Sequence, residues 1–375
     1  MTLQHLPCLF GEILIDVFPD GREVLGGAPF NVAWHLQGFG LTPLLISRVG
    51  ADAAGERIRA AMAAWGMTLD GLQTDPERPT GRVTVNLRDG EPSFDIVADS
   101  AWDFIAADEL PDLIPTIVYH GSLALRNPVS AAALEALLAR RGAGLSGSNA
   151  TPAATRTPPE RQVGSRARSL RFVDVNLRPP WWQGAVVLRL LDGADWAKLN
   201  QDELAWLTSA PGRDPGPQSG SGQGDAASAK GAEPAPEGQP AGPLGAADLV
   251  SLARAAGALR ARHGLTGLVL TLGAAGALGL VEGGEPIQVS PEPAPLVDAV
   301  GAGDAFAAVT LLGLLHHWPL SLTLERAQTF AARIVQLRGA TAPDPALYQD
   351  LCLAWGLGDG RRTGWFQSLT PLGEG

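Results

Sequence analysis

The chain has 375 residues, of which 45% are hydrophobic and 18% are charged. This composition is sufficient for a sizeable hydrophobic core and excludes a chain that is disordered throughout. The formal net charge of -11 argues against binding of nucleic acid or an anionic membrane through a broad basic surface, although it leaves open a local pocket for an anionic substrate.

The cysteines and the apolar segments bear on where the protein works. Cys8 and Cys352 lie near opposite ends of the chain, so we expect free thiols and a cytoplasmic protein rather than a disulfide framework. No Cys/His cluster has the spacing of a zinc site. No basic segment precedes an apolar one at the start, and no run of about 18 apolar residues occurs, so we expect neither a signal peptide nor a membrane helix.

The first part of the chain alternates between predicted strands and predicted helices. An apolar segment at 8–16 predicts a buried strand that ends on the carboxylate of Asp16. Further along we expect a helix at 28–39, a strand at 44–50 and a helix at 53–65. This alternation indicates the α/β class, with a parallel sheet and right-handed crossovers.

A different pattern occupies residues 81–97. Apolar and polar residues alternate there with the period of a half-buried strand, and an Asp-Gly turn signal lies in the middle. We therefore expect an antiparallel hairpin inserted into the α/β chain, where it would serve as a lid or as a contact between subunits. Trp102, just beyond it, is expected to pack under that lid.

The α/β rhythm returns after residue 115. We expect strands at 117–121, 171–176, 196–200 and 267–273, and helices at 131–140 and 304–315. Residues 141–168, rich in Gly, Ser, Thr, Pro and Arg, predict a flexible loop. Residues 208–243 contain no Val, Ile, Leu, Met or aromatic residue and predict a disordered insertion. Because α/β units continue after it, we expect a single domain over 1–375.

The most specific motif lies at 298–306. Gly301, Ala302 and Gly303 precede Asp304, which begins an apolar helix. Exposed N–H groups of such a loop at a helix N-terminus would form an anion hole, and the nearby carboxylate could accept a proton from a hydroxyl. The alternative is that Asp304 only caps the helix.

Other anion-binding or nucleophilic motifs are missing. Neither Lys198 nor Lys230 follows the glycine pattern of a Walker A loop, and Phe306 stands where a dinucleotide fingerprint needs its third glycine. No Gly-x-Ser-x-Gly elbow occurs. A nicotinamide oxidoreductase therefore lacks support, as does a serine hydrolase.

Three segments together resemble one family. Residues 298–306 resemble the carboxy-terminal signature of the ribokinase-like (PfkB) carbohydrate kinases, 26–33 resemble their di-glycine signature, and 200–203 match their Asn-x-x-Glu motif. The resemblance implies a ribokinase-like three-layer α/β/α sandwich with a mostly parallel central sheet and a small β-strand lid from about 12–25 and 80–98. It also implies phosphoryl transfer from ATP to a sugar hydroxyl.

The resemblance assigns roles to the residues that carry the motifs. Asp304 resembles the catalytic base, and Gly301, Ala302 and Gly303 the anion hole. The sugar would contact Asp16, Gly27 and Asn31. The nucleotide would contact Gly301 and Gly303 together with Asn200, Thr271, Gly273 and Gly276.

Two further roles concern metal ions. The resemblance implies that Asn200 and Glu203 organise Mg2+, partly through water, and that Asp298 helps to hold a monovalent cation such as K+. From the residues alone, Asn200 and Glu203 are more typical of a helix capping box than of a metal site, and Asp16 is equally typical of a solvated turn.

The sugar is indicated by less specific features. Residues 174–182 resemble the Asp-x-Asn-x-Arg-Pro stretch of fructokinases and of ketodeoxygluconate kinases, in which Arg178 would hold a phosphate or an acidic substrate if it does not form a surface ion pair. The segment Gly-Gly-Ala-Pro at 26–29 favours fructokinase over ribokinase proper. Phe30 and Trp34 are bulkier than the family pattern and are expected to reshape the acceptor pocket, whereas His35 is expected to be a packing residue.

We therefore expect a fructokinase that uses ATP and Mg2+, and that forms a homodimer through its lid. The alternatives are a ketodeoxygluconate kinase, a ribokinase, a nucleoside kinase, and a sugar- or nucleotide-binding protein without catalysis.

Overall fold

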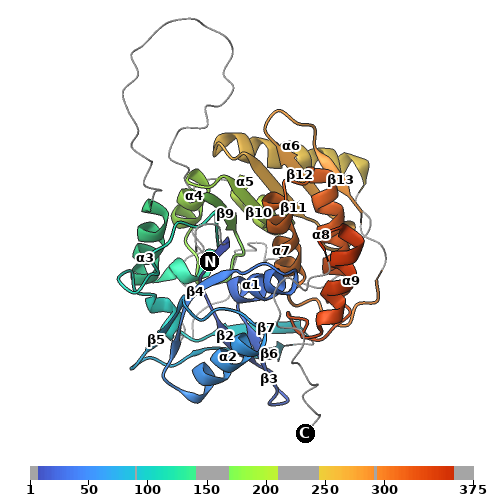
Figure 1. Ribbon diagram of the computed structural model, residues 1–375. Helices are drawn as coiled ribbons and strands as arrows, with labels where there is room; N and C mark the ends of the chain where they lie inside the picture. Colours follow the sequence, from blue (N-terminus) through green and yellow to red (C-terminus); the bar gives the residue numbers. More distant parts are fainter. Residues whose placement is uncertain (1–6, 89–90, 141–168, 210–244, 291–293, 359–375) are drawn as a thin grey trace, which may run out of the picture.

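The computed structural model describes residues 7–88, 91–140, 169–209, 245–290 and 294–358 (Figure 1). The predicted loop at 141–168 lies outside these residues, and so does the predicted insertion from residue 210 onwards. The strands described are β1 (Pro7–Phe10), β2 (Leu14–Val17), β3 (Glu23–Gly26), β4 (Leu44–Gly50), β5 (Leu72–Asp75), β6 (Gly81–Arg88), β7 (Glu91–Ile96), β8 (Ile117–His120), β9 (Leu170–Asp174), β10 (Trp196–Asn200), β11 (Gly267–Thr271), β12 (Ala277–Val281) and β13 (Ile287–Val289). The α-helices are α1 (Ala28–Gly38), α2 (Ala53–Ala64), α3 (Pro128–Ala139), α4 (Gly184–Asp192), α5 (Gln201–Thr208), α6 (Ala246–Arg262), α7 (Ala302–Leu315), α8 (Leu320–Ile334) and α9 (Pro345–Trp355).

The central sheet is mostly parallel. Its order is β13-β12-β11-β10-β9-β8-β1-β4-β5. Every neighbouring pair from β11 to β5 runs parallel, and only β12 and β13 at one edge are antiparallel. The carboxyl ends of the parallel strands therefore meet along one edge, where α/β proteins place their ligands.

Helices cover both faces of this sheet. Leu9 of β1 packs into the core cluster that contains residues of α1, α2, α7, α8 and α9. Cys8 and Phe10, which point to the opposite face of the same strand, pack into the cluster formed with α3, α4, α5 and α6. The expected three-layer α/β/α class is confirmed. Helices α8 and α9 and the edge strands β12 and β13 were not anticipated from the sequence.

A second, small sheet lies at one end of the molecule (Figure 1). Its order is β3-β2-β6-β7, with β2 parallel to β6 and the other two pairs antiparallel. The prediction of one continuous strand over 8–16 was wrong, because β1 belongs to the central sheet and β2 to the small sheet. The chain turns between them at Gly11, which has φ 144°, a value that favours glycine.

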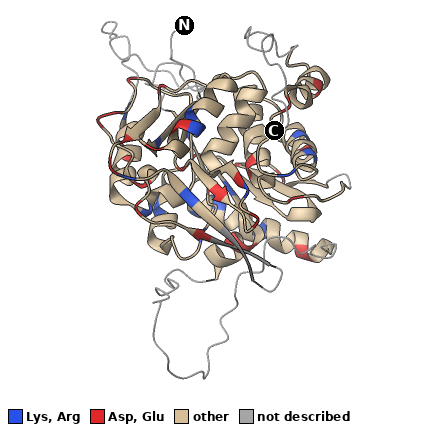
Figure 2. Ribbon diagram, turned by 90° about the horizontal axis from the view of Figure 1, so that it is seen from below, with Lys and Arg blue, Asp and Glu red and all other residues tan. Residues whose placement is uncertain are grey.

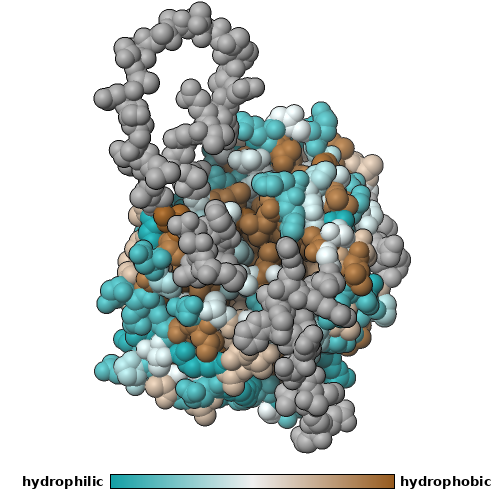
Figure 3. Space-filling model, in the orientation of Figure 1, coloured by the Kyte–Doolittle hydropathy of each residue, from teal (hydrophilic) through white to brown (hydrophobic). Residues whose placement is uncertain are grey.

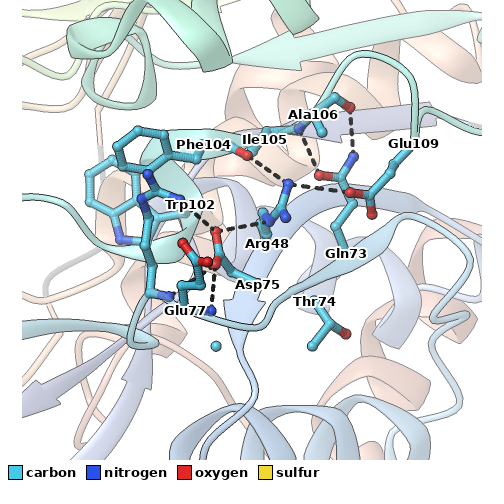
Figure 4. A network of polar contacts seen from close by, with 12 residues as sticks. Arg48, Gln73, Thr74, Asp75, Glu77, Trp102, Phe104, Ile105, Ala106 and Glu109 are labelled. Carbon is cyan, nitrogen blue, oxygen red and sulfur yellow. Dashed lines mark hydrogen bonds and ion pairs between the residues drawn. The ribbon is translucent and has the colours of Figure 1, made fainter.

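A polar network ties both ends of the β6–β7 hairpin to the edge of the central sheet (Figure 4). Arg48 of β4 forms an ion pair with Asp75 at 3.3 Å and donates a hydrogen bond to the carbonyl of Phe104 at 3.0 Å. Asp75 also accepts from the backbone N–H groups of Glu77 and Arg78, in the loop that leads into β6. The entry to the hairpin and the segment after it are thus held to the same arginine.

A buried ion pair supports the small sheet. Arg126 pairs with Asp103 at 2.7 Å and donates to the carbonyl of Val97, which directly follows β7. Its guanidinium lies over the rings of Trp102 and Trp181, at 4.4 and 4.3 Å from their centroids. Trp102 is fully buried against apolar side chains of β2, β6 and β7, so it packs under the small sheet, which is the predicted lid.

Helix α1 is braced by a segment near the end of the described chain. Trp34 donates its indole N–H to the carbonyl of Ala342 at 2.9 Å and stacks on Trp65. His35 lies within hydrogen-bond distance of the Tyr348 hydroxyl and of the Ala340 carbonyl, and burial lowers its pKa to about 3.

This packing confirms one expectation about the helix and corrects another. His35 is a packing residue, as expected. The prediction that Phe30 and Trp34 reshape the acceptor pocket was wrong, because both side chains are buried in the core with the residues of α7, α8 and α9.

Charged residues of both signs are interspersed along the chain. In the ribbon of Figure 2, basic and acidic positions alternate rather than gather in separate regions. On the face shown in Figure 3, apolar patches alternate with hydrophilic ones. Within the described part of the chain, no helix combines the length and the apolar character that crossing a membrane requires.

Candidate active site

Asp304 lies in the first turn of α7, close to the start of α1. The N-cap of α7 is Gly301, which makes no side-chain cap, so Asp304 is not the cap of its helix. Its Oδ2 instead accepts a hydrogen bond from Nδ2 of Asn31 at 2.8 Å. The two residues are 273 positions apart in the sequence, so the fold brings the di-glycine motif and the carboxy-terminal motif together.

The loop before α7 requires glycine at its turn. Gly301 has φ 82°, and a Cβ there would lie 2.4 Å from Cα of Ala340. Asp298 braces the same loop, because its carboxylate accepts from the backbone N–H of Val300 at 3.0 Å and from that of Gly339 at 2.9 Å. The backbone is thereby held with the N–H groups of the first turn at the open end of the helix.

The start of α1 is equally constrained. Gly27 has φ 107°, and a Cβ there would lie 2.5 Å from the carbonyl oxygen of Glu12. This close approach sets the position of Asn31 one turn later. Oδ1 of Asn31 is buried and has no hydrogen-bond partner among the described residues, so it remains an acceptor for another molecule.

Four carboxyl groups and one arginine share this region. Burial raises the pKa of Asp304 to about 6, the hydrogen bond from Asn31 lowers it, and the charge of Asp174 raises it. Burial also raises the pKa of Asp16 to about 6, which the charge of Arg178 opposes and the charge of Asp304 reinforces. Asp16, Arg178 and Asp304, predicted from three separate segments, are therefore close enough for their charges to act on one another.

Glu12 is the fourth of these carboxyl groups, and the sequence did not single it out. Its side chain is 3% exposed, and Oε2 is buried without a hydrogen-bond partner among the described residues. Burial raises its pKa to about 7; the backbone N–H of Glu12 lowers it, the charge of Asp304 raises it and that of Arg178 lowers it. A carboxylate two residues before a lid strand was the only available signal, and it does not distinguish this residue from a surface glutamate.

Replacing Glu12 by Gln should stabilise the fold at pH 8 but not at pH 5. The folded-state pKa of about 7 lies above the ordinary value of 4.5, so the folded protein binds this proton more tightly and is penalised as the pH rises from 4.5 through 7. The gain at pH 8 should be about 2–3 kcal/mol in the free energy of unfolding. Urea unfolding at both pH values measures it, with the exposed Glu325→Gln as control. An equal effect at the two pH values would contradict the assignment.

The Asn-x-x-Glu motif forms a capping box at the start of α5. Oδ1 of Asn200 accepts from the N–H of Glu203 at 2.9 Å, and Oε2 of Glu203 accepts from the N–H of Asn200 at 2.8 Å. The other oxygen, Oε1, accepts from the N–H of Leu177 at 2.8 Å. Glu203 therefore also fixes the segment that carries Arg178.

The predicted nucleotide loop lies beside this motif. Thr271, at the end of β11, pairs in register with Asn200 at the end of β10. Gly273 and Gly276 follow in a tight turn with φ 55° and 97°. Within the described residues the structure records no hydrogen bond from this loop to Asp304. The loop and the Asn31–Asp304 pair are therefore two separate groups of residues along the carboxyl ends of the central strands.

A buried lysine connects the two parts, and it was not predicted as a site residue. Lys198 of β10 lies opposite Asp174 of β9, and its Nζ is 3.0 Å from each oxygen of that carboxylate. Tyr119 of β8 donates its hydroxyl to the same carboxylate at 3.0 Å. Only the strand order β10-β9-β8 brings these three side chains together, so no local pattern could have found them.

Comparison with known proteins identifies relatives along most of the chain. Residues 14–347 match the pfkB family carbohydrate kinase, a range that contains every predicted site residue. A fructokinase from Klebsiella pneumoniae is 29% identical over 363 residues, which cover 91% of this chain and 96% of that relative.

Solved structures support the same fold. A fructokinase double mutant from Vibrio cholerae O395, in its form with fructose, ADP and a potassium ion, has a TM-score of 0.65 at 24% identity and covers 92% of this chain and 97% of its own. An aminoimidazole riboside kinase from Salmonella enterica, complexed with aminoimidazole riboside and an ATP analog, has a TM-score of 0.66 at 21% identity, with 92% and 99% covered. The family match, the relatives and the fold agree: this chain belongs to the pfkB family of carbohydrate kinases and is a phosphotransferase that acts on a sugar.

Proposed function

We propose that this sugar kinase transfers the γ-phosphate of ATP to a hydroxyl of fructose. The observation that carries the proposal is the position of Asp304: a buried carboxylate in the first turn of α7, hydrogen-bonded to Asn31 and electrostatically coupled to Asp16 and Arg178. The relatives that are fructokinases support fructose as the acceptor.

In the proposed reaction Asp304 accepts the proton of the acceptor hydroxyl. The hydroxyl oxygen forms a bond to the γ-phosphorus while the bond from that phosphorus to the bridging oxygen breaks, and the electron pair of the broken bond leaves with ADP. The N–H groups of Gly301 and Gly303, together with that of Ala302, which in this structure donates to the carbonyl of Ala299 at 3.3 Å, would stabilise the charge on the transferring group. The raised pKa of Asp304 makes the carboxylate a better proton acceptor than an ordinary aspartate.

The sugar would be bound between the central sheet and the small sheet. Asp16 and Asn31 would accept or donate hydrogen bonds to its hydroxyl groups, and the backbone at Gly27 would approach it closely. The small sheet would act as a lid that excludes water and limits hydrolysis of ATP. Its outer strands β3 and β7 have unpaired edges within the described sheet, which supports pairing of two copies into a homodimer there.

The nucleotide would lie along the ends of β10 and β11, against Asn200, Thr271, Gly273 and Gly276. The two oxygens of Glu203 already accept backbone N–H groups, so this carboxylate fits Mg2+ held through water and the phosphates rather than by direct ligation. Bound there with Asn200 and Glu203, Mg2+ would neutralise phosphate charge. Asp298, whose two oxygens brace the loop before α7, would support a K+ ion by fixing the carbonyl groups of that loop.

A panel of acceptors tests the proposal. Purified protein with ATP and Mg2+ should phosphorylate fructose with a higher kcat/KM than ribose, 2-keto-3-deoxygluconate or adenosine, measured by ADP release and by detection of the sugar phosphate. Preference for ketodeoxygluconate would indicate that Arg178 binds the carboxylate of that substrate. Preference for adenosine would indicate a nucleoside kinase. Ligand-induced stabilisation without phosphate transfer to any of the four would overturn the proposed activity.

A further inference from the structure

Lys198 is buried near the carboxyl ends of the parallel strands of the central sheet. The residue is 7% exposed, and its ammonium donates to both oxygens of Asp174. Asp174 in turn accepts the hydroxyl of Tyr119, so the carboxylate is held from the side of β8 as well. The ammonium therefore has one well-defined position between β9 and α7.

That position lies between the two motifs predicted to handle phosphate. Burial by itself would lower the pKa of Lys198, but the charges of Asp174, Glu203 and Asp304 raise it, so the side chain stays protonated. A Cβ placed on Gly303 would lie 3.4 Å from Nζ. The charge thus faces the first turn of α7, and it is close enough to the capping box of α5 for the charge of Glu203 to act on it.

The choice of lysine is itself informative. Of the 28 Lys and Arg residues only Lys198 and Lys230 are lysines, and Lys198 is the one within the described part of the chain. An ammonium is compact and presents a point charge to a phosphate, whereas a guanidinium is planar and binds it bidentately. A buried ion pair contributes little to stability compared with apolar residues of similar volume, so stability alone does not account for this pair.

We propose that Lys198 is a further catalytic residue, whose ammonium contacts the phosphoryl group during its transfer at the N-terminus of α7, and that Asp174 and Tyr119 are its positioning residues. The proposal rests on the proposed kinase reaction. As the oxygen–phosphorus bond forms and the bond to the ADP oxygen breaks, the ammonium offsets negative charge on the γ-phosphate oxygens, while the proton of the acceptor goes to Asp304 and not to Lys198.

The competing explanation is that the Lys198–Asp174 pair only holds β9 to β10. A variant that converts the whole cluster to apolar residues separates the two explanations. Lys198→Met, Asp174→Leu and Tyr119→Phe together leave no unpaired polar group, so the fold should be retained. Lys198→Gln with Asp174→Asn is a second variant that keeps a hydrogen-bonded pair without charge, should the apolar version fail to fold.

The experiment measures kcat, the KM for ATP and for the sugar, ADP binding by calorimetry, and thermal unfolding. The catalytic role predicts that the variants fold, bind ADP within about threefold of the wild type, and lose about 10²–10³-fold in kcat. Tyr119→Phe alone, which keeps the ion pair, should lose less than tenfold. A kcat within threefold of the wild type in either multiple variant would overturn the role of Lys198.

Failure of this inference differs from failure of the proposed function. If the wild type transfers phosphate and the variants do so equally well, only the role of Lys198 is lost. If the wild type phosphorylates none of the four acceptors, the proposed reaction and the inference that rests on it are both overturned.

Discussion

Replacing Asp304 by Asn is expected to lower kcat by about 10²–10⁴-fold while the fold remains intact, because a lost general base costs this much. The amide oxygen of the new side chain can still accept the hydrogen bond from Asn31, so the contact between α1 and α7 is kept. Steady-state kinetics and thermal unfolding measure the two effects. Asp350→Asn, an exposed position on α9, is the matched control and should leave both unchanged. Near-normal turnover of the Asp304 variant would contradict the role of the base.

The same carboxylate predicts the acid limb of the pH profile. Because burial raises the pKa of Asp304 to about 6, the base is protonated and inactive below that pH. The value of kcat/KM should therefore fall below pH 6, and for this one group the fall should approach about tenfold per pH unit well below the pKa. The pKa of Asp16 is also about 6, so protonation of a second group makes the fall steeper.

Replacing Gly301 by Ala is expected to destabilise the protein by about 2–5 kcal/mol and to abolish most of its activity. The left-handed backbone at φ 82° costs about 1–2 kcal/mol for a residue with a Cβ. In addition the methyl group would lie 2.4 Å from Cα of Ala340, so backbone must move, at a typical cost of about 1–3 kcal/mol. The movement would displace the N–H groups that are proposed to hold the phosphoryl group.

Gly283→Ala provides the control for this prediction. Gly283 has φ 71°, and a Cβ there would meet no atom within 4 Å, so only the backbone strain applies. Urea unfolding should show a loss of about 1–2 kcal/mol for this variant with unchanged kcat. Equal effects of the two substitutions would show that contact with Ala340 does not matter.

The sequence allowed the fold and the centre of the site to be predicted because their signals are local. Apolar segments alternating with helical ones indicated the parallel sheet, and the glycines before Asp304 indicated the start of α7. The sequence did not predict that the strand is interrupted at Gly11, because the apolar residues on both sides of this glycine would fit a strand in either sheet. The size of Phe30 and Trp34 suggested that they shape the acceptor pocket. Both side chains instead pack in the core against α8 and α9, two helices that the sequence did not predict.

The remaining part of the site depends on register between strands. Asp174 and Lys198 are 24 residues apart and meet only because β9 and β10 pair with those two positions opposite each other. Glu12 looks like a surface glutamate until α1 covers it. Charge pairs and buried acids of this kind are set by tertiary structure, and composition or periodicity does not reveal them.

The contacts of α1 with residues 340–348 have a consequence for synthesis of the protein. Asn31, near the beginning of the chain, sits on a helix whose Trp34 and His35 are held by carbonyl groups of Ala342 and Ala340. A nascent chain that has emerged from the ribosome only as far as α7 already contains Asp304 but lacks this support. We therefore expect the kinase to gain its activity only after residues 340–348 have been synthesised, and fragments truncated before Ala340 to be inert.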